Sequence, residues 1–443
     1  MKKYNPLSPP QILVVGFLIS ILVGTLLLSL PYVHEPNVEL SVTEALFTAT
    51  SAITVTGLNV IDPGTTFNRV GEVIIIILIQ LGGLGFMSFA IWVFVLLGKK
   101  INLRHRLLMQ ENTGQIYLQG IVKLALHLLW ITLALELFGG FLLATRWHYY
   151  MGWGEALFQG FFHAVSAFNN AGFSLFPTGL MNDVNDIFIT IVITSLILLG
   201  GLGFTVIIDI FNKRFRFSMF SLHSKVTLST NLVLISMGIP FFFLIEYGNP
   251  NSLGPLSFIS KLNATYFQVI TTRTAGFNTL DIGLLTQATL FMFIIYMFIG
   301  ASSGSTGGGI KVTTMALIWV SLKSILQGKK DAVIFERRIP VDHVLRGMAI
   351  IILSLTVIII ATLILDITER GQPFLKILFE VVSAFGTVGL SMNFTPELSE
   401  IGRYVIMLVM FIGRLGPLTF GYALAKKVEK EYFKYPEEKM MIG

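Results

Sequence analysis

The chain alternates between long apolar runs and short polar segments. Eight runs are long enough to cross a bilayer, because about 20 residues of helix span its hydrocarbon core. They lie at 12–30, 70–98, 122–145, 186–211, 226–246, 283–300 with a polar continuation to about 322, 344–366 and 401–425. No small-residue cleavage site follows the first run, so we expect an uncleaved span and not a signal peptide.

Four further apolar stretches are too short to cross. They lie at 44–53, 155–168, 257–271 and 373–385, and each ends in small, polar or glycine-containing residues. Broken backbone inside a membrane is tolerated only where protein or water surrounds it. These stretches therefore predict re-entrant half-helices, and the fold class predicted is an all-α polytopic membrane protein with eight transmembrane helices and four re-entrant pore helices.

Composition supports a membrane protein. The 443 residues are 54% hydrophobic and 13% charged, with a mean hydropathy of +0.76. Soluble domains carry about 25% charged residues, so a soluble enzyme of two or three domains is excluded. The absence of cysteine excludes disulfides and thiolate metal sites.

Positive charge marks one side of the membrane. Of the 31 lysines and arginines, 21 lie in five short segments, 2–3, 99–106, 213–225, 323–346 and 426–439, which alternate with regions poor in Lys and Arg. Loops rich in these residues stay in the cytoplasm. We expect a multi-pass protein of the cell membrane with both termini cytoplasmic and the half-helices opening outward. The net charge of +6 is then topogenic and predicts no nucleic-acid partner.

An internal repeat organises the chain. Residues 51–58, 166–173, 270–277 and 383–390 align without gaps on Gly57, Gly172, Gly276 and Gly389, which are 115, 104 and 113 residues apart. The alignment predicts four span–half-helix–loop–span units at 1–105, 106–222, 223–330 and 331–425, followed by a cytoplasmic tail at 426–443. Each unit crosses the membrane an even number of times, so the copies are parallel and surround one central pore.

A second echo follows the half-helices. Residues 81–86 and 199–204 share the sequence LGGLGF, and 412–417 reads IGRLGP in the fourth unit. Clustered glycines let helices approach closely, so we expect packing surfaces here in place of moving hinges. Arg414 replaces the glycine equivalent to Gly83, and a charge within an apolar span needs a partner or water.

The loops after the half-helices favour a monovalent cation. A half-helix directs its carbonyl end toward the axis, and rings of carbonyls can replace the hydration shell of an alkali ion. None of the aligned segments contains Asp or Glu, which argues against a calcium or magnesium filter. The predicted filter residues, whose backbone carbonyls would bind the transported alkali ion, are Thr54, Val55, Thr56, Gly57, Asn169, Asn170, Ala171, Gly172, Arg273, Thr274, Ala275, Gly276, Gly386, Thr387, Val388 and Gly389.

These features resemble the Trk/Ktr/HKT superfamily of potassium transporters. The resemblance rests on the four units, on one aligned glycine in each loop and on the segment GASSGSTGGGIK at 300–311. It implies potassium uptake driven by the membrane potential, with selectivity carried by the filter glycines and sodium permeation associated with serine in the first loop. It also implies a homodimer and a separate cytoplasmic ring of Rossmann-type (RCK/KTN) subunits that binds nucleotide.

The segment 300–309 holds five glycines and four Ser or Thr residues. Each glycine costs a helix about 1 kcal/mol relative to alanine, so an unwound loop is expected, and inside a membrane it lines water or the pore. Together with the family resemblance, the segment 300–309 predicts a movable gate below the filter. The predicted gate residues are Gly300, Ala301, Ser302, Ser303, Gly304, Ser305, Thr306, Gly307, Gly308, Gly309, Lys311 and Arg414. For Arg414 the alternatives are a structural salt bridge and a pore-facing barrier or loop contact, the role that the resemblance implies.

Other charged residues leave alternatives open. Arg273 would repel cations if it faced the axis, so we expect it behind the filter. Glu136 and Asp209 support a competing hypothesis, a sodium- or proton-coupled secondary carrier, although packing explains Glu136 and an i,i+4 pair with Lys213 explains Asp209. No catalytic motif and no organic cofactor site are expected.

Overall fold

The computed structural model describes residues 8–85, 121–329, 331–424, 436 and 438, and helices dominate them. Four buried half-helices lie at the centre: α2 (Val42–Thr54), α8 (Trp153–Phe168), α12 (Phe258–Thr271) and α16 (Phe374–Gly386). They match the four predicted short stretches to within two residues at each end. The prediction of an all-α membrane fold with re-entrant helices is therefore confirmed.

Local capping explains where these helices start and stop. Ser41 accepts a hydrogen bond from the Glu44 amide, and the Glu44 carboxylate accepts one from the Ser41 amide at 3.0 Å, which forms a capping box ahead of α2. At the other end, Val55 adopts a left-handed conformation and stops the helix. Every residue from 47 to 58 is buried, so the half-helix lies inside protein.

Each half-helix is preceded and followed along the chain by a further helix of its unit. The preceding helices are α1 (Pro9–Leu28), α7 (Ile121–Met151), α11 (Leu222–Glu246) and α15 (Val341–Thr368). The following helices are α4 (Arg69–Leu84), α9 (Ile187–Leu202), α13 (Gln287–Phe298) and α17 (Glu400–Leu415). Within the described residues, four helices are long and apolar enough to cross a membrane, or up to six if each bent pair counts as one span.

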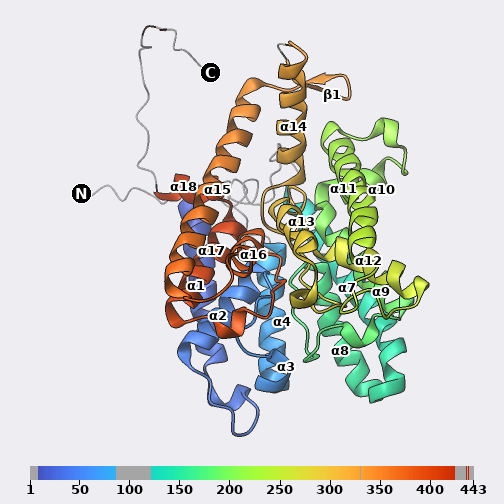
Figure 1. Ribbon diagram of the computed structural model, residues 1–443, viewed down its shortest axis with the longest axis vertical. Coiled ribbons are helices and arrows are strands. Elements are labelled where there is room, and N and C mark those ends of the chain that lie inside the picture. The colour runs from blue at the N-terminus through green and yellow to red at the C-terminus, as the bar shows by residue number, and fades with distance from the viewer. Residues whose placement is uncertain (1–7, 86–120, 330, 425–435, 437, 439–443) are drawn as a thin grey trace.

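Shorter elements complete the chain. The further helices are α3 (Pro63–Thr66), α10 (Phe204–Asn212), α14 (Val312–Leu326) and α18 (Pro417–Leu424), with 3-10 turns η1 (Pro31–Val33), η2 (Met181–Asp183), η3 (Phe217–Met219), η4 (Ile282–Leu284) and η5 (Thr395–Glu397). An antiparallel hairpin pairs β1 (Val333–Ile334) with β2 (Arg337–Arg338). Figure 1 shows α14 and α15 projecting together from one end of the helical bundle, with this hairpin at their tip.

Two spans that we predicted as continuous are broken. The predicted run 186–211 bends by 96° between α9 and α10, and the run 401–425 bends by 98° between α17 and α18. Gly203 and Gly416 adopt φ values of +90° and +84° at these breaks, a conformation open to glycine because it lacks Cβ. Hydrophobic residues continue on both sides of these glycines, so the hydropathy pattern did not reveal the bends.

Some predictions fall outside the described residues. The predicted span 70–98 is described only as far as Gly85, which also has a positive φ of +80°. The unit boundaries near 105, 330 and 425 and most of the tail at 426–443 lie outside the described part of the chain. The division into four units at those boundaries stays a prediction.

Long side chains on the outer helices face outward, as a lipid environment requires. Leu26 on α1, Leu244 on α11 and Ile367 on α15 are 68–75% exposed. The inner ends of the half-helices, by contrast, carry fully buried phenylalanines, among them Phe168 and Phe385. This arrangement places a rigid, buried core around the loops that follow the half-helices.

Candidate functional site

The segment after each half-helix has the same backbone conformation in all four copies. Two residues before each aligned glycine, Val55, Asn170, Thr274 and Thr387 adopt left-handed φ values of 57°, 57°, 70° and 51°. The glycines follow at 89°, 68°, 77° and 90°. The residue between them has no positive φ in any copy, so all four segments share one alternating pattern of backbone turns.

The four aligned glycines form a closed ring. A methyl group built on Gly57 would strike the Ala171 carbonyl, one on Gly172 would lie 2.9 Å from the Gly276 Cα, one on Gly276 would strike the Val388 carbonyl, and one on Gly389 would strike the Thr56 carbonyl. Each glycine thus faces the next segment, and the fourth returns to the first. The loops meet around one axis in chain order, with no room for a side chain at these positions.

Serines at the end of two half-helices hold the glycine amides. Ser51 Oγ accepts a hydrogen bond from the Gly57 amide at 3.0 Å, and Ser383 Oγ accepts one from the Gly389 amide at 3.1 Å. Each serine lies six residues before its glycine. These bonds use the amides and leave the carbonyl oxygens of the segment free for a ligand.

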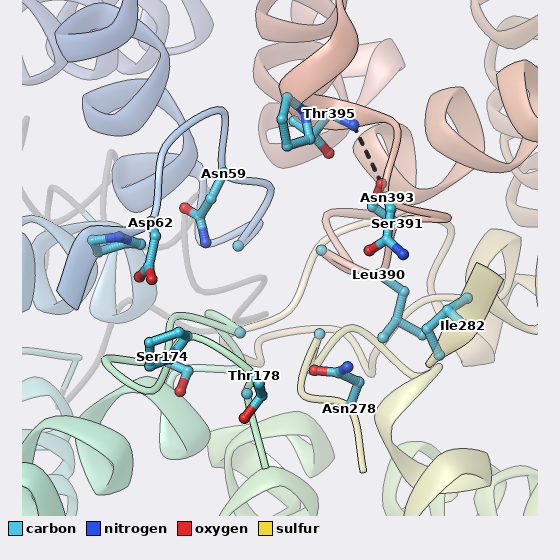
Figure 2. A pocket seen from close by; sticks show the side chains of 18 of the residues that line it. Asn59, Asp62, Ser174, Thr178, Asn278, Ile282, Leu390, Ser391, Asn393 and Thr395 are labelled. Carbon is cyan, nitrogen blue, oxygen red and sulfur yellow. Dashed lines mark hydrogen bonds between the residues drawn. The ribbon is translucent and has the colours of Figure 1, made fainter. Parts of the chain in front are cut away.

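Above the ring, the loops enclose a cavity of about 300 Å³. The four aligned glycines are among the residues that line it. Asn59, Ser174, Asn278 and Ser391, each two residues beyond a glycine, also lie around it (Figure 2). The lining includes two carboxylates, Asp62 and Asp281. Burial raises the pKa of Asp62 above its usual value, against the opposing effect of the Gly64 amide. This cavity, called the mouth below, attracts cations while both carboxylates are ionised.

The side chains of several predicted filter residues point away from the axis. Thr54 Oγ1 donates to the Thr50 carbonyl at 2.7 Å, within its own helix. Asn169 Nδ2 donates to Gln80 Oε1 at 2.7 Å and to Glu136 Oε1 at 2.9 Å, behind the second segment. Gly386 is the last residue of α16. The contribution of these positions to the axis is therefore limited to the backbone.

Arg273 lies buried with its guanidinium near Tyr296 of α13, and its Nε and Nη1 have no hydrogen-bond partner among the described residues. Tyr296 itself donates to the Leu234 carbonyl at 2.9 Å, so this region lies between α11 and α13. The remaining predicted filter residues are buried in the converging segments: Val55, Thr56, Asn170, Ala171, Thr274, Ala275, Thr387 and Val388.

The glycine-rich loop 300–309 lies against the inner ends of three half-helices. Thr306 Oγ1 donates to the Phe168 carbonyl at 3.2 Å, and the Gly308 amide donates to Thr387 Oγ1 at 3.0 Å. A methyl group on Gly307 would strike Thr274 Oγ1. The loop thus contacts three of the four converging segments next to the ring, and none of its residues lines the mouth.

The break between α9 and α10 anchors this loop. The Gly200 and Gly201 carbonyls accept from the amides of Thr306 at 3.3 Å and Ser302 at 3.1 Å. On the far side of the bend, the Phe204 amide donates to the Gly304 carbonyl at 3.0 Å. A broken helix leaves amides and carbonyls without helical partners, and here the loop satisfies them.

Two positively charged side chains, Arg414 and Lys311, donate hydrogen bonds to carbonyls of the loop. Arg414 donates to the Thr306 carbonyl and to the Gly82 carbonyl at the end of α4. Lys311 Nζ donates to the Gly307 carbonyl at 2.7 Å. Neither side chain is paired with a carboxylate of the described residues, and both line a cavity of about 160 Å³ next to the loop. Among the described residues, Arg414 therefore contacts the loop and makes no salt bridge.

The glycine clusters have two roles. Methyl groups on Gly82, Gly200 and Gly413 would strike the carbonyls of Ile53, Phe168 and Phe385, which occupy the same place in three half-helices. The first glycine of each cluster therefore packs against a half-helix, as expected. At Gly203 and Gly416 the last glycine of the cluster bends the chain, which the packing hypothesis did not predict.

Two buried residues beside the mouth escaped the sequence prediction. His163 on α8 and Glu380 on α16 are fully buried, and each contacts a serine of the mouth. Their signal was a fixed spacing, since each lies nine residues before its aligned glycine. The position is visible only when the alignment is extended upstream through the half-helix.

Comparison with known proteins shows the family. A family model described as TrkH, cation transport protein, matches residues 9–435. The Ktr system potassium uptake protein B of Bacillus subtilis is 45% identical over 441 residues, covering 100% of this chain and 98% of the relative. The potassium/sodium uptake protein NtpJ of Enterococcus hirae is 38% identical, covering 99% of this chain and 98% of the relative.

A solved structure shares the fold. The potassium transporter TrkH from Vibrio parahaemolyticus superposes with a TM-score of 0.71 at 21% identity, covering 96% of this chain and 86% of that one. The match extends over the half-helices and the helices that flank them. Together with the family match over nearly the whole length, this places the chain in the TrkH family of cation transport proteins.

Proposed function

We propose that this protein takes up potassium across the cell membrane through a path lined by backbone carbonyls. The closed ring of Gly57, Gly172, Gly276 and Gly389 carries the proposal, because it brings four carbonyl-bearing segments to one axis. Rings of carbonyl oxygens replace the hydration shell of potassium. The potassium uptake named in relatives such as the B. subtilis protein supports the same ion, which the membrane potential would drive inward.

The loop 300–309 would act as the gate. It contacts three of the converging segments beside the ring and is held by hydrogen bonds to several elements, which supports this role. An ion leaving the ring meets this loop before it reaches the cavity lined by Lys311 and Arg414. Opening then requires the loop to leave Thr387 and Phe168, and Arg414 opposes that movement by binding the Thr306 carbonyl.

Regulation would come from another protein. The described part of the chain contains no nucleotide-binding fold, and its largest predicted cytoplasmic stretch is the tip between α14 and α15. The family resemblance supports a cytoplasmic nucleotide-binding ring, a homodimer and cytoplasmic termini. The exposed Arg337 and Arg338 of the hairpin suit contact with an acidic partner surface.

A coupled carrier is the competing hypothesis, through Glu136 or Asp209. Both carboxylates are engaged: Glu136 accepts from Gln80 at 3.1 Å and from Asn169 at 2.9 Å, and Asp209 pairs with Lys213 at 2.7 Å. Neither lines the mouth or the cavity below the loop. The carbonyl path therefore fits the geometry better.

Cation flux into liposomes tests the proposal. The purified protein without a partner should carry flux that follows an imposed potassium gradient and needs no second ion. Gly57→Ser should lower selectivity for potassium over sodium, because the side chain would strike the Ala171 carbonyl. Gly154→Ser is the matched control, since no atom lies within 4 Å of its added Cβ. Flux that requires a sodium or proton gradient would refute the proposal in favour of the carrier.

A further inference from the structure

Two of the four half-helices hold the chain beyond the filter glycine by the same device, a hydrogen bond between a half-helix side chain and a serine. His163 Nε2 lies 3.0 Å from Ser174 Oγ, and Ser391 Oγ donates to Glu380 Oε2 at 2.7 Å. The half-helix residue lies nine positions before the glycine in both copies, and the serine lies two positions after it. Two different side chains thus make the same contact at equivalent places, which points to a shared role.

The serines pass this contact on to the backbone. Ser174 Oγ accepts from the Phe176 amide at 3.0 Å, and Ser391 Oγ accepts from the Phe394 amide at 3.0 Å. Glu380 also accepts from the Thr395 hydroxyl. Each half-helix side chain therefore fixes the turn that leads out of its filter segment, immediately above the glycine ring.

His163 is itself held rigidly. Its Nδ1 lies 2.8 Å from the Gln159 carbonyl, so Nδ1 carries the proton and Nε2 accepts from the Ser174 hydroxyl. Its ring stacks on Phe176 with 4.7 Å between centroids and meets Trp147 edge-on at 5.0 Å. The imidazole is fully buried, so it has no path to an ion in the mouth.

The other two half-helices lack the device. Thr48 occupies the equivalent place in α2, and its hydroxyl donates to the Glu44 carbonyl at 2.9 Å, within the helix. In α12 the place belongs to Phe267, which has no polar atom. The residues beyond these two glycines are Asn59 and Asn278, which lie beside the mouth (Figure 2). Held and unheld segments therefore alternate around the ring, so the two held segments are opposite each other.

We propose that His163 and Glu380 are positioning residues that fix opposite sides of the filter and thereby set its preference for potassium. The proposal rests on the proposed function of the carbonyl path. Neither side chain touches the ion. Each one restrains the carbonyls of its segment through a serine, so that the ring keeps the width of a potassium ion and does not contract around sodium.

The test measures the ratio of potassium to sodium permeability of the full-length protein in liposomes. Glu380→Leu and His163→Phe remove the bond to the serine but keep an apolar volume. Each should lower the ratio about tenfold, the effect of losing one such bond, and Glu380→Leu at least that much because it also removes the bond from Thr395. Ser391→Ala should lower the ratio as well, and the double variant with Glu380→Leu should lose less than the two single losses combined, because both remove the bond between Ser391 and Glu380. Glu380→Gln, which can still bind both hydroxyls, should restore the ratio.

Thr48→Val is the matched control, because it alters the equivalent residue of a segment without the device, and it should keep the wild-type ratio. Wild-type ratios in Glu380→Leu, His163→Phe and Ser391→Ala would overturn the inference. If Glu380→Leu fails to fold, Ser391→Ala removes the same bond with the loss of one oxygen and decides the matter. A wild-type protein without potassium preference would instead refute the proposed function itself.

Discussion

Replacing Thr387 with valine isolates one bond that holds the glycine-rich loop against the segment that ends at Gly389. Thr387 Oγ1 accepts from the Gly308 amide at 3.0 Å, and Gly308 is buried. Valine has nearly the same shape, and the left-handed conformation of this position already accommodates valine in the first unit, at Val55 with φ 57°. The change therefore removes an acceptor from the loop and leaves the filter backbone in place.

The expected effect follows because Thr387→Val leaves the Gly308 amide without its hydrogen-bond acceptor. A buried donor without a partner costs about 1–3 kcal/mol. The closed position of the loop loses this amount, whereas an open loop exposes the Gly308 amide to water and loses nothing. The equilibrium then moves toward the open position by about 5–150-fold, and potassium flux through a mostly closed protein rises by the same factor.

The assay is potassium flux into liposomes that contain equal amounts of folded wild-type or Thr387→Val protein. The ratio of potassium to sodium permeability should stay constant, because the carbonyls are unchanged. Thr356→Val is the control, since the Thr356 hydroxyl donates to the Ile352 carbonyl on the exposed face of α15, away from the path. Unchanged flux in folded Thr387→Val protein would show that the loop does not limit permeation.

Three further perturbations test other parts of the account. Arg414→Met should increase potassium flux, because it frees the Thr306 carbonyl of the loop, whereas a loss of folded protein without increased flux would indicate a structural role. Gly200→Ala should lower the free energy of unfolding in detergent by about 1–3 kcal/mol, because the added methyl group overlaps the half-helix. Gly421→Ala is the control, since no atom lies within 4 Å of its added Cβ. Equal stabilities of the two variants would contradict the packing argument. Asp62→Asn should reduce potassium flux at low ionic strength and have little effect near 1 M salt, where the screening length is about 3 Å; a loss that persists at high salt would contradict electrostatic attraction at the mouth.

The sequence predicted the half-helices well because they combine two local signals. A stretch such as 373–385 is apolar yet too short to span, and a small-residue segment with an aligned glycine follows it, so both its nature and its end are visible; α16 begins and ends one residue later. The unwound segment between α13 and α14 was predictable for a similar reason, since its glycines weaken a helix within an apolar environment.

Other features depend on contacts that no local pattern records. The bends at Gly203 and Gly416 occur within continuous hydrophobic runs. The loop that hydrogen-bonds the backbone groups freed at Gly203 lies about a hundred residues further along the chain. The bond between Glu380 and Ser391 likewise requires the chain to leave the half-helix, pass the aligned glycine and return. Repeat alignment supplies equivalent positions, but only the fold shows which of them touch.

The location of the bound ion tests the central claim most directly. Rubidium or thallium, which substitute for potassium and are visible by anomalous scattering, can be located in crystals of this protein. The account predicts density on the axis of the glycine ring, within reach of carbonyls from residues 55–57, 170–172, 274–276 and 387–389. Density beside Glu136 or Asp209, with none on that axis, would contradict it.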